Sequence, residues 1–526
     1  MPGSQTQTAA YWTNSFRVNR ADIEYLSSQF LEEETPLSTR ELALRLIDFR
    51  LSQEEETLRR QIASGELFQP KESYTVGQEL IFPAYGYTVG KVVGQRAGQN
   101  SGDGDFTVIE VEFEDEQRRE FASMLHTPHL LNYDEAGGQQ YTQTKALSAE
   151  TILDSYGETI MDEIEGKLID QEDAIFFAGK WFLRSLLVDV NVGQLHLAEA
   201  ILDINSGGPL PTAAMLDDLD LAKETKPELA EFSLNVAMSN DERFDDVGPV
   251  SQVQWYLRRL EPPEVTKTPT RLIYQPLDYD RSLITGELAT LERELDDELS
   301  VLEPPTNQPK EAVLTLIYPH RRVGSLPLTS RVEQLFPTAT TSQRIRVTLI
   351  DAQDQTEFAG WVMREDRYVF GLNEFYRKYR LPVGAYVTLR ATDDPSRLVI
   401  DFEAHRPRTE YIRLAQPNNG HLTFANFKRS IGAGYDELLI LGSEDIEGVD
   451  AIWSTNRDRK RGLVEIMRDL IPELARLNPQ NSVHAKTLYG AVNIVRRCPP
   501  GPIFAALVSR PEFQHVGGPY WRLVQN

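Results

Sequence analysis

Two segments of the chain, one central and one C-terminal, repeat the same order of predicted elements. Each segment contains three helices followed by a hairpin, with expected helices over Gln194–Ile204 and Phe232–Met238 and over Leu463–Leu477 and Lys486–Arg497. Chance can produce such a match, but the shared order favours a diverged repeat. Five positions match at identical spacing: Leu234, Met238, Phe244, Val247 and Gly248 against Ile503, Leu507, Phe513, Val516 and Gly517.

A tryptophan follows in the last strand of each segment, Trp255 in the first and Trp521 in the second. With the aromatic-x-x-Val-Gly entry into the hairpin, both segments resemble the winged-helix family found in the RNA polymerase delta subunit and fused to restriction and chromatin proteins. The resemblance predicts an acidic winged helix over 191–262 and a basic one over 451–526. It implies association with nucleic acid or polymerase rather than catalysis.

Residues 17–70 predict a helical N-terminal unit, in which Ser38 caps a helix and Glu41 completes a capping box. Either a degenerate helix-turn-helix or a helical cap on the next domain fits this pattern. Residues 72–135 change to a period of two, so short strands around glycine-rich turns resemble an SH3-like small barrel. Such barrels bind peptides, nucleic acids or nothing. Residues 147–190 predict a hairpin of two long helices, and the apolar stretch Ala174–Val192 reads as a buried amphipathic helix.

Residues 263–312 predict an acidic helix, Leu291–Leu302, followed by a Pro-rich linker, and residues 404–450 a connecting segment. Between them, residues 313–403 alternate as β-strands around one helix, Asn373–Tyr379. The order of Trp361, Gly371 and Phe375 resembles the DNA-binding pseudobarrel of plant transcription factors. Ala385 stands where that family has Asp, and the expected Trp after Gly371 is missing, so a generic split barrel is the alternative. The fold class expected is therefore multidomain α+β, with tandem winged-helix units, an SH3-like small barrel and a second β-barrel.

Composition excludes several classes of protein. The 526 residues include 54 Lys and Arg against 80 Asp and Glu, a net charge of −26, which argues against a wholly basic nucleic-acid coat. One cysteine, Cys498, excludes a disulfide framework and a zinc site of several thiolates. We expect a cytoplasmic protein without a membrane span. His126 and His129 lack a third ligand nearby, and Cys498 has no catalytic partner placed by the sequence, so we expect no metal, no cofactor and no catalytic residue.

Charge separates the modules. Residues 191–262 carry 5 basic and 13 acidic side chains, a net −8, whereas residues 451–526 carry 11 and 5, a net +6. Because phosphate attraction supplies most non-specific affinity for DNA, the basic C-terminal unit is the expected DNA contact. Asn456–Arg461 is a basic run suited to phosphate contact or to simple solvation. The nucleic-acid-binding candidates are Lys486, Arg496, Arg497, Arg510, His515, Tyr520 and Arg522 near the C-terminus, and Arg364, Arg367, Arg377, Lys378 and Arg380 in the barrel.

The sequence therefore predicts a DNA-associated, non-enzymatic binding protein, with a role in transcription as one implication. The C-terminal winged helix would contact phosphates, and the acidic modules would contact a protein partner such as transcription machinery. A protein-interaction scaffold without nucleic-acid binding is the alternative. An enzyme with a site assembled across domains has no motif behind it.

Overall fold

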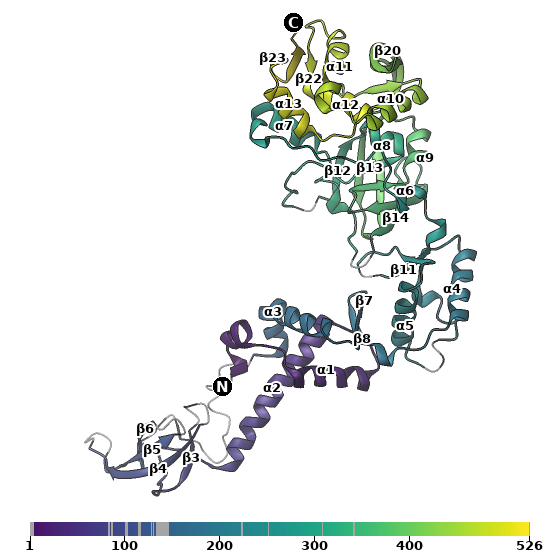
Figure 1. Ribbon diagram of the computed structural model, residues 1–526. Coiled ribbons are helices and arrows are strands. Elements are labelled where there is room, and N and C mark those ends of the chain that lie inside the picture. The colour runs from purple at the N-terminus through teal and green to yellow at the C-terminus, as the bar shows by residue number, and fades with distance from the viewer. Residues whose placement is uncertain are drawn as a thin grey trace. The chain divides into compact units, whose positions relative to one another are not determined.

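The computed structural model describes residues 5–82, 85, 88–99, 104–113, 117–127, 129, 131–132, 147–221, 223, 225–250, 252–307, 309–339 and 342–524. Helices and several small sheets alternate along the chain, which gives a mixed α/β fold (Figure 1). The chain divides into two compact units, 1–189 with 224–233 and 190–223 with 234–526. No helix in the described ranges is long and apolar enough to cross a membrane.

The first unit begins with short helical turns, η1 (Gln5–Gln7) and η2 (Tyr11–Ser15), and then forms α1 (Arg20–Glu33), β1 (Leu37–Ser38) and α2 (Thr39–Ser64). The predicted capping box is confirmed, since the Ser38 hydroxyl accepts the Glu41 amide and the Glu41 carboxylate accepts the Ser38 amide. α2 continues without interruption from Thr39 to Ser64, and Gly65 follows its last residue.

A five-stranded sheet follows α2, in the order β2 (Glu66–Leu67), β3 (Glu79–Phe82), β4 (Thr88–Ala97), β5 (Thr107–Phe113) and β6 (Arg118–Ser123). The predicted alternation in β5 is confirmed, because Ile109 and Val111 are fully buried. They pack with Phe68, Phe82 and Val92 in a small separate core. Part of the expected turn between β4 and β5 lies outside the described residues.

The prediction of two long helices over 147–190 is wrong in its second half. α3 (Ala149–Ile169) is helical, but Ala174–Phe177 and Lys180–Leu183 form a hairpin, β7 and β8. Ala178 and Gly179 both adopt positive φ, which gives the turn whose twist suits a two-residue hairpin loop. Four aromatic side chains in these eight strand residues also favour strand over helix.

The middle of the chain forms α4 (Val192–Ile204), β9 (Leu210–Pro211), the single turn η5 (Thr212–Ala214), α5 (Pro227–Ser239), β10 (Phe244–Asp246) and β11 (Gln254–Leu257). α5 begins in the first unit and ends in the second. The closing hairpin of this segment is present, but one of its three expected helices is missing, because Thr212–Ala214 forms only a 3-10 turn. η6 (Arg258–Leu260), α6 (Pro263–Thr266) and η7 (Arg281–Leu283) follow within an otherwise extended segment.

The C-terminal end forms α11 (Leu463–Ala475), β22 (Val483–His484), α12 (Ala485–Val495), α13 (Pro500–Ser509), β23 (Phe513–Gly517) and β24 (Tyr520–Leu523). All three expected helices and the closing hairpin are present. Their apolar faces form one core with α10 (Ile446–Asp458) and α7 (Gly286–Leu295). In Figure 1 these elements gather around the C-terminal end of the chain.

Three segments, not two, share one arrangement, in which a helix, a short strand, further helical turns and a hairpin follow in order. The last strand is central in each small sheet, in the orders β1-β8-β7, β9-β11-β10 and β22-β24-β23. A tryptophan of that strand faces an apolar residue of the short strand in each case, Trp181 to Leu37, Trp255 to Leu210 and Trp521 to Val483. We call them the N-terminal, middle and C-terminal repeats. The small sheet of β2–β6 interrupts the first.

The tryptophan that the three repeats share differs among them in its hydrogen bond. The Trp181 indole N–H donates to Thr39 Oγ1 at 3.1 Å, and that of Trp255 to Thr212 Oγ1 at 3.0 Å. Both threonines lie two residues after the apolar partner of the tryptophan. Ala485 occupies this position in the C-terminal repeat, and the buried Trp521 indole N–H has no hydrogen-bond partner among the described residues.

A seven-stranded sheet joins the middle and C-terminal repeats in sequence. Its order is β12 (Glu311–Thr315), β17 (Tyr386–Ala391), β18 (Arg397–Phe402), β14 (Arg344–Asp351), β15 (Glu357–Met363), β16 (Tyr368–Phe370) and β13 (Ser325–Pro327). The strands predicted over 313–403 are confirmed, as is the helix α9 (Asn373–Lys378). α8 (Tyr318–Val323) and η8 (Glu333–Leu335) complete it. Trp361 faces Tyr256 of the middle repeat, with ring centres 5.1 Å apart.

Residues 404–450, which the sequence predicts to be a connecting segment, form three strands and the start of a helix. β19 (Ala404–Asn418) and β20 (His421–Ala433) form a long antiparallel hairpin, and β21 (Leu441–Ser443) adds to β19 in parallel. α10 follows. The acidic helix is also shorter than expected, because α7 ends at Leu295 and Asp296 adopts left-handed φ. Asp296, Asp297 and Glu298 lie beyond the helix and are buried rather than solvated.

Candidate functional site

The structure places the C-terminal candidates in three different environments. His515, Tyr520 and Arg522 lie together on the β23–β24 hairpin, where His515 and Arg522 are exposed. The Arg522 guanidinium donates to the Gln514 side chain at 2.9 Å, and Tyr520 packs edge-on against His484. Arg510 is exposed after α13 with no ion pair to any described residue. These side chains are accessible at the surface.

Lys486 and Arg497 are not accessible, because both are about as buried as core residues. Lys486 is 5% exposed and pairs with Asp436 and, at 3.2 Å, with Glu294. Arg497 is 3% exposed and pairs with Asp297 and Glu298, each at 2.7 Å. A phosphate would have to break these buried pairs to reach either cation, so a DNA contact here cannot rest on them.

The helix α13, the third helix of the C-terminal repeat, carries no charged side chain. Seven of its ten residues are buried. Tyr279 packs so closely on Gly501 that an added Cβ would lie 2.5 Å from the phenol oxygen. The extended segment after α6 therefore covers this helix, and α13 does not present a surface for a DNA groove.

The five candidates in the seven-stranded sheet do not converge either. Arg364 donates to three main-chain carbonyls and pairs with Glu333, and Arg367 donates to the Glu298 carbonyl at 2.7 Å. Lys378 is held between Asp351 at 2.7 Å and Asp354, and Arg377 pairs with Glu374 at 3.4 Å. Arg380 alone is exposed without an ion pair to the described part of the chain. Most of these cations stabilise local structure.

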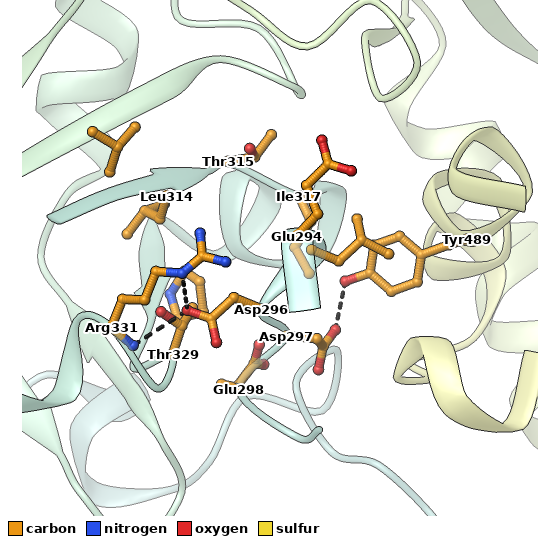
Figure 2. Close-up of a pocket in the computed structure, with 13 residues that line it drawn as sticks. Glu294, Asp296, Asp297, Glu298, Leu314, Thr315, Ile317, Thr329, Arg331 and Tyr489 are labelled. Carbon is orange, nitrogen blue, oxygen red and sulfur yellow. Dashed lines mark hydrogen bonds and ion pairs between the residues drawn. The ribbon is translucent and has the colours of Figure 1, made fainter. Parts of the chain in front are cut away.

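Arg497 belongs to a buried cluster of charged groups beside a small acidic pocket. Figure 2 shows Asp297 directed at the Tyr489 hydroxyl and Asp296 directed at Arg331 across the pocket. Glu298 also contacts His320 Nε2 at 2.9 Å. Burial opposes the ionisation of Glu298, but Arg497 and His320 outweigh it and lower the pKa of this carboxyl. Burial raises the pKa of Asp297.

The size of the acidic pocket decides its role. Its volume is about 30 Å³, enough for one or two water molecules rather than for a substrate. Its carboxylates also pair with Arg497, His320 and Arg331. We therefore interpret this cluster as a structural clamp that fixes the end of α7 to α8 and α12.

The remaining reactive groups of the C-terminal repeat are also structural. Burial raises the pKa of the Cys498 thiol to about 12 against the opposing effect of Arg497 and Arg496. The flanking cations therefore do not activate it. Burial and Lys486 lower the pKa of His484 to about 4, so its neutral ring accepts the Lys486 amide and caps α12. His126 and His129 are part of no cluster of metal-ligating side chains among the described residues.

A larger pocket of about 210 Å³ opens where α10 ends. It is formed by three parts of the second unit that are far apart in sequence: the extended segment near 270–275, the end of α10 with its following loop, and the junction of α12 with Arg496. Five of its twelve lining side chains are cationic and none is acidic, as the lining consists of Thr270, Ile273, Gln275, Trp453, Asn456, Arg457, Lys460, Arg461, Ile466, Val495, Arg496 and Arg497. We call it the cationic pocket.

Local backbone geometry sets the positions of the pocket's cations. The Arg461 amide donates to the Asn456 carbonyl, and the Lys460 amide donates to the Arg457 carbonyl, so α10 ends in a Schellman motif. Lys460 takes the left-handed position of this motif, with φ of 50°, where glycine is the usual residue. This turn places Lys460 and Arg461 at the pocket beside Arg457. The Arg496 guanidinium donates to the Arg461 carbonyl at 2.9 Å and so joins them.

The charges of the pocket are only partly compensated. Arg461 pairs with Asp469 at 2.9 Å, and Arg457 pairs with its neighbour Asp458 at 3.0 Å. Lys460 and Arg496 form no ion pair with any described residue. Trp453 carries the guanidinium of Arg457 at 4.8 Å from its ring centre and that of Arg271 at 4.6 Å. The pocket can therefore bind an anion by charge-assisted hydrogen bonds.

The sequence identified part of this site. The basic run Asn456–Arg461 and Arg496 were both named as phosphate candidates, and the structure brings them together. Trp453 and the segment near 270–275 were missed, because they reach the pocket only through folding. Comparison with known proteins finds no family model, no curated protein and no solved structure that matches this chain.

Proposed function

We propose that this protein is a non-enzymatic DNA-binding protein that holds DNA phosphates at the cationic pocket of its C-terminal unit. The observation that carries the proposal is a pocket lining without a carboxylate that holds four cations besides the buried and neutralised Arg497, in a chain of net charge −26. Two of the four, Lys460 and Arg496, form no ion pair with any described residue, so an anion would complete the pocket, and the basic lining resembles the electrostatic footprint of nucleic-acid binding.

The three repeats support the same proposal at the level of fold. We propose that each is a diverged winged helix, since the central last strand and the hairpin match the resemblance described above. The small sheet inserted in the N-terminal repeat would be the SH3-like barrel, and the seven-stranded sheet the pseudobarrel. Since α13 is covered and uncharged, DNA would bind beside the C-terminal repeat, at the end of α10, rather than along α13.

Two substitutions test the pocket with little cost to folding. Lys460→Gly removes a cation from a left-handed position that glycine adopts without strain, and Arg496→Gln keeps a donor toward the Arg461 carbonyl. The full chain with labelled duplex DNA is titrated by fluorescence anisotropy at several salt concentrations. With about four phosphate contacts, log affinity should fall against log salt with a slope near −3.6, and each substitution should reduce its magnitude by about 0.9.

Arg20→Gln in the first unit is the matched control, because Arg20 is also a surface cation, with 92% of its side chain exposed. Its slope should equal that of the unmodified protein. A slope unchanged by both pocket substitutions, or no binding to DNA at low salt, contradicts the proposal.

A second candidate function, protein interaction, rests on the exposed face of α4 in the middle repeat. Only Ala198 and Leu202 are buried in this helix, whereas Val192, Leu197 and Ile204 are 66%, 44% and 85% exposed. Exposed apolar side chains on one element mark interaction surfaces. A photo-crosslinking residue at position 197 should capture a defined partner in cells, and one at position 20 should not. An equal pattern at both positions contradicts this candidate.

A further inference from the structure

The β19–β20 hairpin has an exposed part that packs on little else. Its tip region is held by α10, α11 and β21, but residues 404, 406–409 and 411 of β19 and residues 426–430 of β20 are exposed. The register is regular between Arg408 opposite Ile431 and Ile412 opposite Phe427. We call residues 404–411 with 426–431 the ribbon.

The ribbon carries cations that no carboxylate neutralises. Arg406, Arg408 and Lys428 form no ion pair with any residue the structure describes, whereas Arg429 pairs with Glu444. Lys428 lies over the Tyr411 ring at 5.2 Å from its centre. Tyr411 is 66% exposed and Phe427 42% exposed. Cationic, aromatic and small polar side chains therefore cover most of this two-stranded element, whose one acidic residue, Glu410, lies opposite Arg429.

Dimensions restrict what such an element can enter. Two paired strands lie about 4.8 Å apart and rise about 3.3 Å per residue, so the six residues 426–431 extend roughly 20 Å. The opposite strand is irregular between Ala404 and Arg408. The major groove of B-form DNA, about 12 Å wide, admits a two-stranded ribbon with its side chains. The major groove of A-form RNA is too deep and narrow for side chains to read.

We propose that the ribbon enters the major groove of B-form duplex DNA, with Arg406, Arg408 and Lys428 contacting phosphates and base edges. The inference rests on the proposed function, because the cationic pocket holds the same duplex by its phosphates. The pocket accepts phosphate from either duplex, whereas the ribbon requires the wider groove of DNA.

The test compares three ligands of equal length with the full chain: duplex DNA, duplex RNA and single-stranded DNA. The ribbon variant combines Arg406→Gln, Arg408→Gln and Lys428→Gln, which leaves the buried Ile412, Ile431 and Ile440 beneath the ribbon intact. A matched control replaces three exposed cations of the first unit, Arg17, Arg20 and Arg40, by Gln. Circular dichroism verifies that each variant is folded.

We expect the unmodified protein to bind duplex DNA more tightly than duplex RNA, and the ribbon variant to lose this preference. Its affinity for duplex DNA should fall about tenfold or more, with the salt slope smaller by about 1.8, because two of the about four phosphate contacts remain at the pocket. Its affinity for duplex RNA should stay within twofold of the unmodified protein.

Two results overturn the ribbon proposal while leaving the pocket: equal losses for both duplexes, or tightest binding to single strands that Tyr411→Ala abolishes, which would make the ribbon a stacking platform. Loss of duplex DNA binding in Lys460→Gly but not in the ribbon variant also overturns it. Absence of binding to every ligand overturns the proposed function itself.

Discussion

Replacing Arg497 by Met tests whether this residue stabilises the fold, as the structure indicates, or binds DNA, as the sequence predicted. The guanidinium is the shared partner of Asp297 and Glu298, and all three side chains are at most 4% exposed. Removing one partner of a buried ion pair leaves uncompensated charge and costs about 3–5 kcal/mol. Two carboxylates lose their partner here, so we expect a value toward the upper end of this range.

The pH dependence of the loss follows from the same contacts. Arg497 and His320 lower the pKa of Glu298 in the folded protein. Glu298 therefore contributes stability above its ordinary pKa, and this contribution is lost as pH falls through the lowered value. Without Arg497, burial dominates and the pKa rises, so the carboxyl binds a proton on folding. The difference between variant and unmodified protein should be largest at neutral pH and shrink below about pH 4.5.

Hydrogen exchange of α12 measures this loss in the intact chain, because this helix is buried along its whole length. A loss of about 3–5 kcal/mol corresponds to exchange faster by roughly two to four orders of magnitude. Replacing Asp297 by Asn and Glu298 by Gln together with Arg497→Met should restore most of the protection. Unchanged exchange combined with lost DNA binding would refute the reasoning and return Arg497 to the DNA interface.

Three further predictions concern single buried groups. Burial next to Asp245 raises the pKa of Glu261, so stability should fall as pH rises from about 4.5 toward the raised value; Glu261→Gln should abolish this fall and melt at a higher temperature at pH 9, but not at pH 5. Thr212→Val should lower the free energy of unfolding by only about 1 kcal/mol, because Asn235 still accepts the Trp255 indole N–H. Ala485→Thr should raise it by about as much, because the new hydroxyl can accept the Trp521 indole N–H, and it should shift that proton downfield in NMR spectra. Cys498 is fully buried, so Ellman's reagent should detect no thiol in the native protein and one per chain in denaturant; rapid native labelling would show that the C-terminal repeat opens.

Local patterns predicted much of this fold, because they report contacts between neighbours in the sequence. The Ser38 capping box, the alternation in β5 and the closing hairpin at Phe513 each depend on fewer than a dozen residues. The sequence does not show the N-terminal repeat, because the small sheet separates α2 from α3 along the chain. The β7–β8 hairpin of this repeat is as apolar as a buried helix, and apolar content alone does not distinguish a hairpin from a helix.

The buried charge cluster and the cationic pocket could be predicted less well, because each is formed by residues that lie far apart in the sequence. The sequence predicts Asp297 and Glu298 to be part of an acidic helix, because Arg497, which neutralises them, lies about 200 residues further along the chain. For the same reason, the sequence does not show that Arg497 is buried. The cationic pocket shows the reverse case, since its basic run was visible but Trp453 and the segment near Thr270 join it only in the folded chain.

The repeats differ in whether a helix end can position a cation of the pocket. Arg496 follows α12, a helix of eleven residues, whereas the corresponding part of the middle repeat is the three-residue turn η5. The middle repeat therefore has no helix end at which such a cation could stand. Arg457, Lys460 and Arg461 come from α10 and its loop, which precede the C-terminal repeat. The cationic pocket thus depends on elements outside the repeat as well as on Arg496 within it, so basic substitutions in the middle repeat would not create a second pocket.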